Sequence, residues 1–140
     1  MNGSNEISFG QIEADIFVAE ASMAKSESST PKFAKFYKGL AGYHLQQAAE
    51  KLIKYQIYAS GVQLDYSKMY KHSLNELLTY AQTLGITIDI PEWIEEKKQI
   101  ISTWEARGRY DIHFVVRIDT LRKCYKEVQV WKERLIKRYR

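Results

Sequence analysis

Apolar residues recur every three or four positions through most of this chain, which is the period of helices that bury one side. The first such segment covers residues 7–26 and ends in a short Ser-rich connection. Its predicted inner positions are Ile12, Ile16, Ala19 and Met23.

A second, longer helix is predicted from Pro31 to about Ala59. Thr30 before Pro31 is a capping residue followed by proline in the first turn, a common way to begin a helix. Gly61 can adopt the left-handed conformation with which helices commonly end. The predicted inner stripe of this helix is Ala41, Leu45, Ala48 and Leu52.

Three further helices follow. Ser73 and Glu76 have capping-box spacing ahead of a leucine-rich run that stops at Gly85. Pro91 opens a fourth helix that Gly108 breaks, and a fifth is predicted over residues 111–137. Long helices joined by short connections favour antiparallel neighbours, so we predict an all-α, up-and-down bundle of four to five helices.

The composition fits one domain over residues 1–140, with a core at about 7–135. No apolar run reaches the roughly 18 residues needed to cross a bilayer, and the first residues lack a signal-peptide pattern. The single Cys124 and the three His have no metal-site spacing. We therefore expect a cytoplasmic protein with no membrane contact, no metal and no cofactor.

Charge is distributed unevenly. Residues 1–30 hold five acids against one base (net −4), whereas residues 117–140 hold nine bases against three acids (net +6). The basic end is either a surface that binds a polyanion or a solvated helix face that the acidic first helix partly neutralises.

A polar stripe runs beside the apolar stripe of the second helix. Tyr43, Gln47, Glu50 and Lys54 recur at helical spacing, with Lys51 alongside. An open face of this kind can hydrogen-bond a base, a phosphate or a partner helix. Alternatively, Glu50 and Lys54 form an ordinary ion pair four residues apart, worth a few tenths of a kcal/mol.

Arg107, Arg109 and His113 lie close together at the junction of the fourth and fifth helices. A guanidinium can clamp phosphate, and an imidazole can move a proton near neutral pH. Together they could cleave RNA without metal, by activating the ribose 2′-hydroxyl and stabilising the charge on phosphorus. The alternative is that both arginines cap the carbonyls at the end of the fourth helix.

The remaining candidates have simpler interpretations. His72 precedes a capping residue, and His44 is expected to be packed or half-exposed on the second helix. Cys124 stands among Lys123, Tyr125 and Lys126, whose charges could activate its thiol. A partly buried, inert thiol is the interpretation that we favour.

Three blocks of the chain, in this order and at these separations, resemble the HEPN (higher eukaryotes and prokaryotes nucleotide-binding) domain. They are Leu45-Gln46-Gln47-Ala48-Ala49-Glu50-Lys51-Leu52-Ile53-Lys54, Lys71-His72-Ser73-Leu74-Asn75-Glu76-Leu77-Leu78 and Ala106-Arg107-Gly108-Arg109-Tyr110. The resemblance covers about residues 7–135.

The resemblance implies a helical bundle that commonly forms a homodimer and is often encoded beside a minimal nucleotidyltransferase, as in toxin–antitoxin systems. In its ribonuclease branch, Arg, four to six residues and then His form a metal-independent site across the dimer interface. Arg107 and His113 have this spacing, although Gly108 replaces the usual polar residue. Another branch has Arg-Tyr-Pro, which Arg109 and Tyr110 match but Asp111 does not.

Three functional hypotheses follow. In the first, a homodimer binds a nucleotide or a nucleotidyltransferase partner through Tyr43, Gln47, Glu50, Lys51, Lys54, Arg109 and Tyr110. In the second, the protein is an endoribonuclease toxin that uses Arg107 or Arg109 with His113 and binds RNA. In the third, it is only a dimerisation scaffold. An apolar patch for the second subunit is expected around Tyr80, Trp93 or Trp131.

Overall fold

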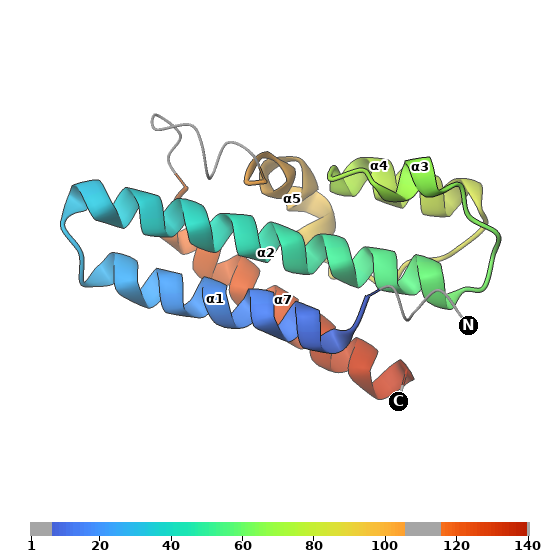
Figure 1. Cartoon of the computed structure of the whole chain (residues 1–140), viewed down its shortest axis with the longest axis horizontal. Coiled ribbons are helices and arrows are strands. Elements are labelled where there is room, and N and C mark those ends of the chain that lie inside the picture. Colours follow the sequence, from blue (N-terminus) through green and yellow to red (C-terminus); the bar gives the residue numbers. More distant parts are fainter. Residues whose placement is uncertain (1–6, 106–115, 140) are drawn as a thin grey trace.

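Two long helices, α1 (Phe9–Glu27) and α2 (Pro31–Ala59), form an antiparallel hairpin around which the other helices are arranged (Figure 1). The computed structural model describes residues 7–105 and 116–139. The remaining helices are α3 (Tyr66–Met69), α4 (Leu74–Thr83), α5 (Glu92–Thr103) and α7 (Ile118–Tyr139). Within those two ranges there is no strand, so the all-α prediction is confirmed.

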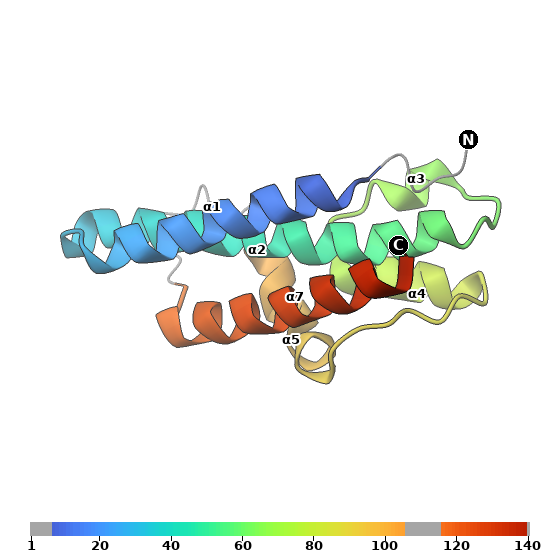
Figure 2. The ribbon, with the colours of Figure 1, turned by 90° about the horizontal axis from the view of Figure 1, so that it is seen from below.

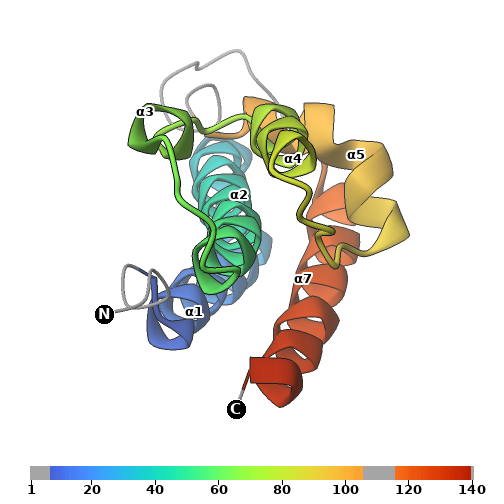
Figure 3. The ribbon, with the colours of Figure 1, turned by 90° about the vertical axis from the view of Figure 1, so that its right-hand side faces the viewer.

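Helix α2 is the central element. Viewed along its axis, α1 and α7 lie on one side of it and α4 and α5 on another (Figure 3). Helices α1 and α7 also contact each other, and in the view from below both run alongside α2 (Figure 2). The predicted apolar stripes of α1 and α2 are confirmed as core, because every member is buried.

The predicted helix ends are largely confirmed. Ser73 Oγ accepts a hydrogen bond from the Glu76 amide at 3.3 Å. Gly61 and Gly85 have φ angles of +74° and +75°, which a side chain would strain. The cap of α1 was not predicted: Ser8 Oγ accepts from the Gln11 amide, and the Gln11 side chain accepts from the Ser8 amide.

Three sequence predictions need correction. Trp131 is not a surface residue, because it is fully buried and its indole donates to the Asp89 carbonyl at 2.7 Å. The helix predicted over residues 111–137 does not run through Val116 and Arg117, and α7 begins at Ile118, where Asp119 in the first turn suits a helix N-terminus. Residues 111–115 lie outside the described residues. The four-residue α3 was missed because it is too short to show a period.

Asp89, in the connection between α4 and α5, joins α2 to α7. The Gln56 side chain donates to its carbonyl at 2.9 Å and accepts from its amide at 2.8 Å. Its carboxylate accepts two hydrogen bonds from Arg134, at 2.7 and 2.8 Å, which raise the pKa of that guanidinium. The connection is therefore fastened through both backbone and side chain.

The basic helix α7 is partly neutralised by α1. Arg122 pairs with Glu27, and the Tyr125 hydroxyl donates to Glu20 at 2.6 Å, a hydrogen bond that raises the pKa of the tyrosine. These contacts agree with the interpretation of α7 as a solvated face balanced by the acidic first helix.

Helix α2 carries a glycine where it meets α5. A Cβ built on Gly42 would lie 3.2 Å from two ring atoms of Trp104, a side chain that is only 1% exposed and has little room to move. The absence of a side chain at residue 42 is what allows the tryptophan to approach the helix.

We therefore predict that Gly42→Val lowers the free energy of unfolding by about 1–3 kcal/mol, since inserted methyl groups overpack the contact. Gly10→Val is the control, because a Cβ there would meet only Ser8 Oγ at 3.6 Å. Urea denaturation followed by circular dichroism measures both. Equal stability of the two variants would contradict this account of Gly42.

Candidate functional site

The first polar cluster on α2 is centred on Glu50, whose side chain is 5% exposed. Its Oε1 accepts from Gln46 Nε2 at 3.0 Å and lies 3.0 Å from His72 Nδ1. Its Oε2 accepts from Lys54 Nζ at 2.8 Å. One carboxylate thus holds an amide, an imidazole and an ammonium group.

This cluster fastens the segment between α2 and α4. Gln46 Nε2 also donates to the His72 carbonyl at 2.9 Å, so the chain just before α4 is bound to the middle of α2. The expectation that Glu50 and Lys54 lie on an open face is therefore wrong. They are only 4% and 9% exposed, because tertiary contacts from a segment distant in sequence cover that side of the helix.

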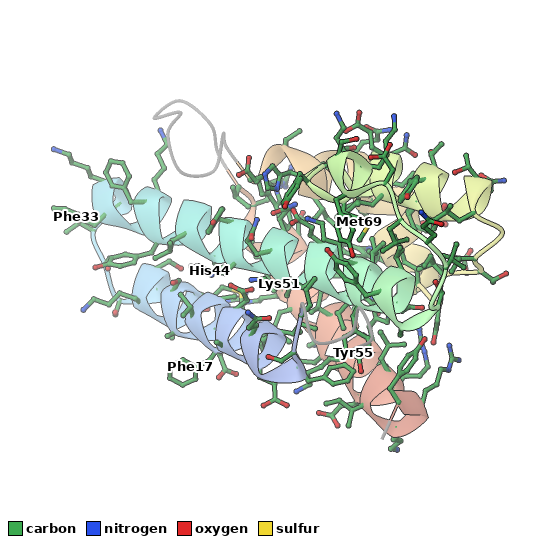
Figure 4. All side chains as sticks on the ribbon, turned by 45° about the vertical axis from the view of Figure 1, so that its right-hand side comes forward. Phe17, Phe33, His44, Lys51, Tyr55 and Met69 are labelled. Atoms are coloured by element: carbon green, nitrogen blue, oxygen red, sulfur yellow. The ribbon has the colours of Figure 1, made fainter. Side chains whose placement is uncertain are left out.

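A second cluster lies between α1 and α2, on a neighbouring side of α2. Asp15 is 8% exposed, and its Oδ1 lies 2.8 Å from His44 Nδ1. Its Oδ2 accepts from Lys51 Nζ at 2.5 Å. Figure 4 shows His44 and Lys51 along the side of α2 that faces α1. As at Glu50, one buried carboxylate holds a histidine and a lysine.

Between these clusters runs a half-buried polar strip, which we define as Tyr43, Gln47 and Lys51. Gln47 Nε2 donates to Gln46 Oε1 at 2.8 Å, which fixes the amide. The Tyr43 ring lies edge-on to His44, with ring centroids 5.0 Å apart. The Lys51 side chain remains 25% exposed. The strip presents an aromatic ring, an amide and an ammonium group, all of which can contact a nucleotide.

The other predicted site residues, Arg107, Arg109, Tyr110 and His113, lie outside the described residues. The chain on either side of them is well packed: Trp104 is 1% exposed and Val116 is 4% exposed. Trp104 and Val116 therefore belong to the core, and the Trp104 ring packs on Gly42 of α2.

The structure also tests the interpretation of Cys124. Cys124 is completely buried, and burial raises the pKa of its thiol far above the usual range, so the neighbouring lysines do not activate it. In residues 7–105 and 116–139, no group of three or more His, Cys, Asp or Glu side chains is placed to hold a metal ion.

One groove of about 380 Å³ lies at α3 and α4, and its lining includes Lys68, Lys71 and Tyr80. None of the predicted site residues lines it. The predicted residues that the structure describes form a surface strip beside two buried clusters, and this strip is not part of the groove.

A comparison with protein-family models matched the HEPN domain over residues 18–137, from the middle of α1 almost to the end of α7. The chain belongs to the HEPN family. No curated protein and no solved structure matched it in the two other comparisons. Among the described residues of this HEPN chain, no helix is long and apolar enough to span a membrane.

Sequence reasoning missed four members of the clusters, namely Asp15, His44, Gln46 and His72. For Asp15 a signal was present: it lies one residue before Ile16 and three after Ile12, at the edge of the inner stripe of α1. A carboxylate at such a position needs a partner from the facing helix. His44 and Gln46 gave no comparable signal, since both fit an exposed helix face.

We predict that Glu50→Ala lowers the free energy of unfolding by about 3–5 kcal/mol, because it leaves the buried Lys54 ammonium without its counter-charge. Glu95→Ala is the control. That residue also pairs with a lysine, Lys98, at 3.1 Å, but its side chain is 46% exposed, so its loss should cost less than about 1 kcal/mol. Similar costs for the two variants in urea denaturation would show that the Glu50 cluster is not structural.

Proposed function

We propose that this HEPN protein is a homodimeric module that binds a nucleotide, or a nucleotidyltransferase partner, as one half of a toxin–antitoxin-like pair. The observation that carries the proposal is the half-buried strip of Tyr43, Gln47 and Lys51, on a chain that belongs to the HEPN family. Membership in the HEPN family supports the pairing with a second protein. The polar strip supports α2 as the place where the nucleotide or the partner binds.

The chemistry of the strip suits a nucleotide. Lys51 carries the positive charge for a phosphate, and Asp15 holds its ammonium group in place. Gln47 has an amide that can hydrogen-bond a base edge, and Tyr43 has a ring on which a base can stack. Glu50 and Lys54, which we first placed in the binding face, instead support it from behind as a buried ion pair.

The proposal predicts that Lys51→Gln weakens binding roughly tenfold or more, because the charged hydrogen-bond donor is replaced by a neutral and slightly shorter amide. Isothermal titration with ATP, GTP and AMP, and with the product of the neighbouring gene, measures the affinity. Lys98→Gln is the matched control, since Lys98 also pairs with a carboxylate but lies on α5.

Absence of heat with every nucleotide and with the neighbouring gene product would contradict the proposal and leave the scaffold hypothesis. Light scattering on the same samples tests the dimer. A strict monomer at micromolar concentration would contradict that part.

A second candidate function is metal-independent cleavage of RNA by Arg107 or Arg109 with His113. One observation favours it: the described residues nearest to these positions in sequence include Trp104 and Val116, and both are buried in the core. A catalytic pair that lies in sequence between two core residues is better positioned than one on a free tail.

This candidate predicts RNA cleavage in EDTA that falls by about 10²–10⁴-fold in His113→Ala, the usual contribution of a general acid or base. His72→Ala is the control, because that imidazole is exposed and lies 3.0 Å from Glu50, outside the proposed catalytic pair. Gel electrophoresis of a labelled RNA gives the rates. Intact RNA at high protein concentration would remove the candidate.

A further inference from the structure

The groove of about 380 Å³ at α3 and α4 lies across α2 from α1 (Figures 1 and 3). Its volume is within the usual range for small-ligand sites, about 300–1,000 Å³. Lys68 of α3 and Lys71 of the following connection form one wall, and the other lining residues all belong to α4. No residue of the polar strip lines the groove, so it is a separate place on the surface.

Contacts with α4 and α2 fix the two segments that carry the lysines. The Tyr80 hydroxyl of α4 accepts a hydrogen bond from the Asp65 amide at 2.7 Å, directly before α3. The residue after Lys71 is His72, whose carbonyl accepts from Gln46 of α2 at 2.9 Å. The backbone of this wall is therefore held in place before a ligand binds, which reduces the entropy cost of binding.

The two lysines of the groove have no counter-charge. Neither Lys68 nor Lys71 forms an ion pair within the part of the chain that the structure describes. The nearest acid before them in the chain is Asp65, and its carboxylate accepts instead from the amide and the hydroxyl of Ser67, at 3.0 and 2.7 Å. An anion in the groove can therefore accept charge-assisted hydrogen bonds from both ammonium groups.

The wall formed by α4 offers mainly neutral hydrogen-bonding groups. Asn75, Thr79 and Thr83 are spaced at i, i+4 and i+8, so an amide and two hydroxyls follow one another along the groove. The Thr83 hydroxyl donates to the Tyr80 carbonyl at 2.6 Å, which leaves its oxygen as an acceptor. Glu76 is the one carboxylate among the described lining residues. Together these groups supply both donors and acceptors for the hydroxyl groups of a ligand.

From this arrangement we infer that the groove between α3 and α4 binds a small phosphate monoester that carries hydroxyl groups, with its phosphate at Lys68 and Lys71. The hydroxyl groups then contact Asn75, Thr79 and Glu76. Glu76 favours this class of ligand, because its carboxylate accepts hydrogen bonds from hydroxyls but repels a second anionic group. A sugar phosphate and the ribose phosphate part of a nucleotide share this chemistry. The inference does not depend on the function proposed for the polar strip.

A phosphate matches two ammonium groups better than a carboxylate does. At pH 7 a phosphate monoester carries a charge of about −1.5 to −2 on three strong acceptor oxygens. A carboxylate carries a single charge on two oxygens. The pair of lysines therefore favours a phosphate.

Isothermal titration of the full chain with ribose 5-phosphate at low salt tests the inference. We expect binding that is at least tenfold weaker for Lys68→Gln and for Lys71→Gln, since each variant loses a charged hydrogen-bond donor. Ribose lacks the phosphate and should also bind at least tenfold more weakly. Thr79→Val keeps the shape of the side chain and should weaken binding about two- to tenfold, through the loss of one neutral hydrogen bond.

Lys126→Gln is the matched control. Lys126 of α7 is also exposed and has no ion pair among the described residues. This variant should bind ribose 5-phosphate like the unmodified protein.

A parallel titration with AMP identifies the source of the phosphate monoester. If AMP binds more tightly than ribose 5-phosphate and Lys71→Gln weakens both, the ligand is a nucleotide. If AMP binds equally or more weakly, and Lys71→Gln weakens the binding of ribose 5-phosphate, the ligand is a sugar phosphate.

Three results would overturn the inference. The first is no binding of ribose 5-phosphate or AMP at low salt. The second is binding that Lys68→Gln and Lys71→Gln leave unchanged; if Lys51→Gln abolishes that binding, the function proposed for the strip stands while this inference fails. The third is equal affinity for inorganic phosphate and ribose 5-phosphate, because the α4 wall would then contribute nothing.

Discussion

The burial of the middle of α2 is the constraint on which the rest of the structure depends. Where α1, α4, α5 and α7 cover it, this helix must satisfy its polar side chains inside the protein, because water cannot reach them. It does so with Gln46, Glu50, Lys54 and Gln56, and no buried side-chain polar atom of the described residues lacks a partner. Each of these contacts also fixes a neighbouring segment, as when Gln46 binds His72 or Gln56 binds Asp89.

The fold could be predicted from the sequence because its signals are local. Caps such as Ser73, terminating glycines such as Gly85 and the 3.6-residue period depend only on neighbouring residues. The start of α7 was predicted less well, since Val115 and Val116 continue the helical pattern while the helix itself begins later. The pattern shows which residues are able to form a helix, and tertiary contacts decide where the helix begins.

The candidate site was harder to predict, because its burial depends on tertiary contacts between residues that are distant in sequence. Helical spacing correctly grouped Gln47, Glu50 and Lys54 on one side of α2, but it cannot tell whether a distant segment covers that side. The His72 region does cover it, so Glu50 and Lys54 became internal supports while Gln47 and Lys51 stayed accessible. A single sequence contains no local signal for a contact between residues 46 and 72.

The contacts of α7 have a consequence for how the chain folds. The hairpin of α1 and α2 closes a connection of only a few residues, whereas Tyr125 meets Glu20 across 105 positions and Trp131 meets Asp89 across 42. Short-range pairing is fast and long-range pairing is slow. We therefore expect the hairpin to form before α7 covers its apolar side, and the chain to be most prone to aggregation during that interval.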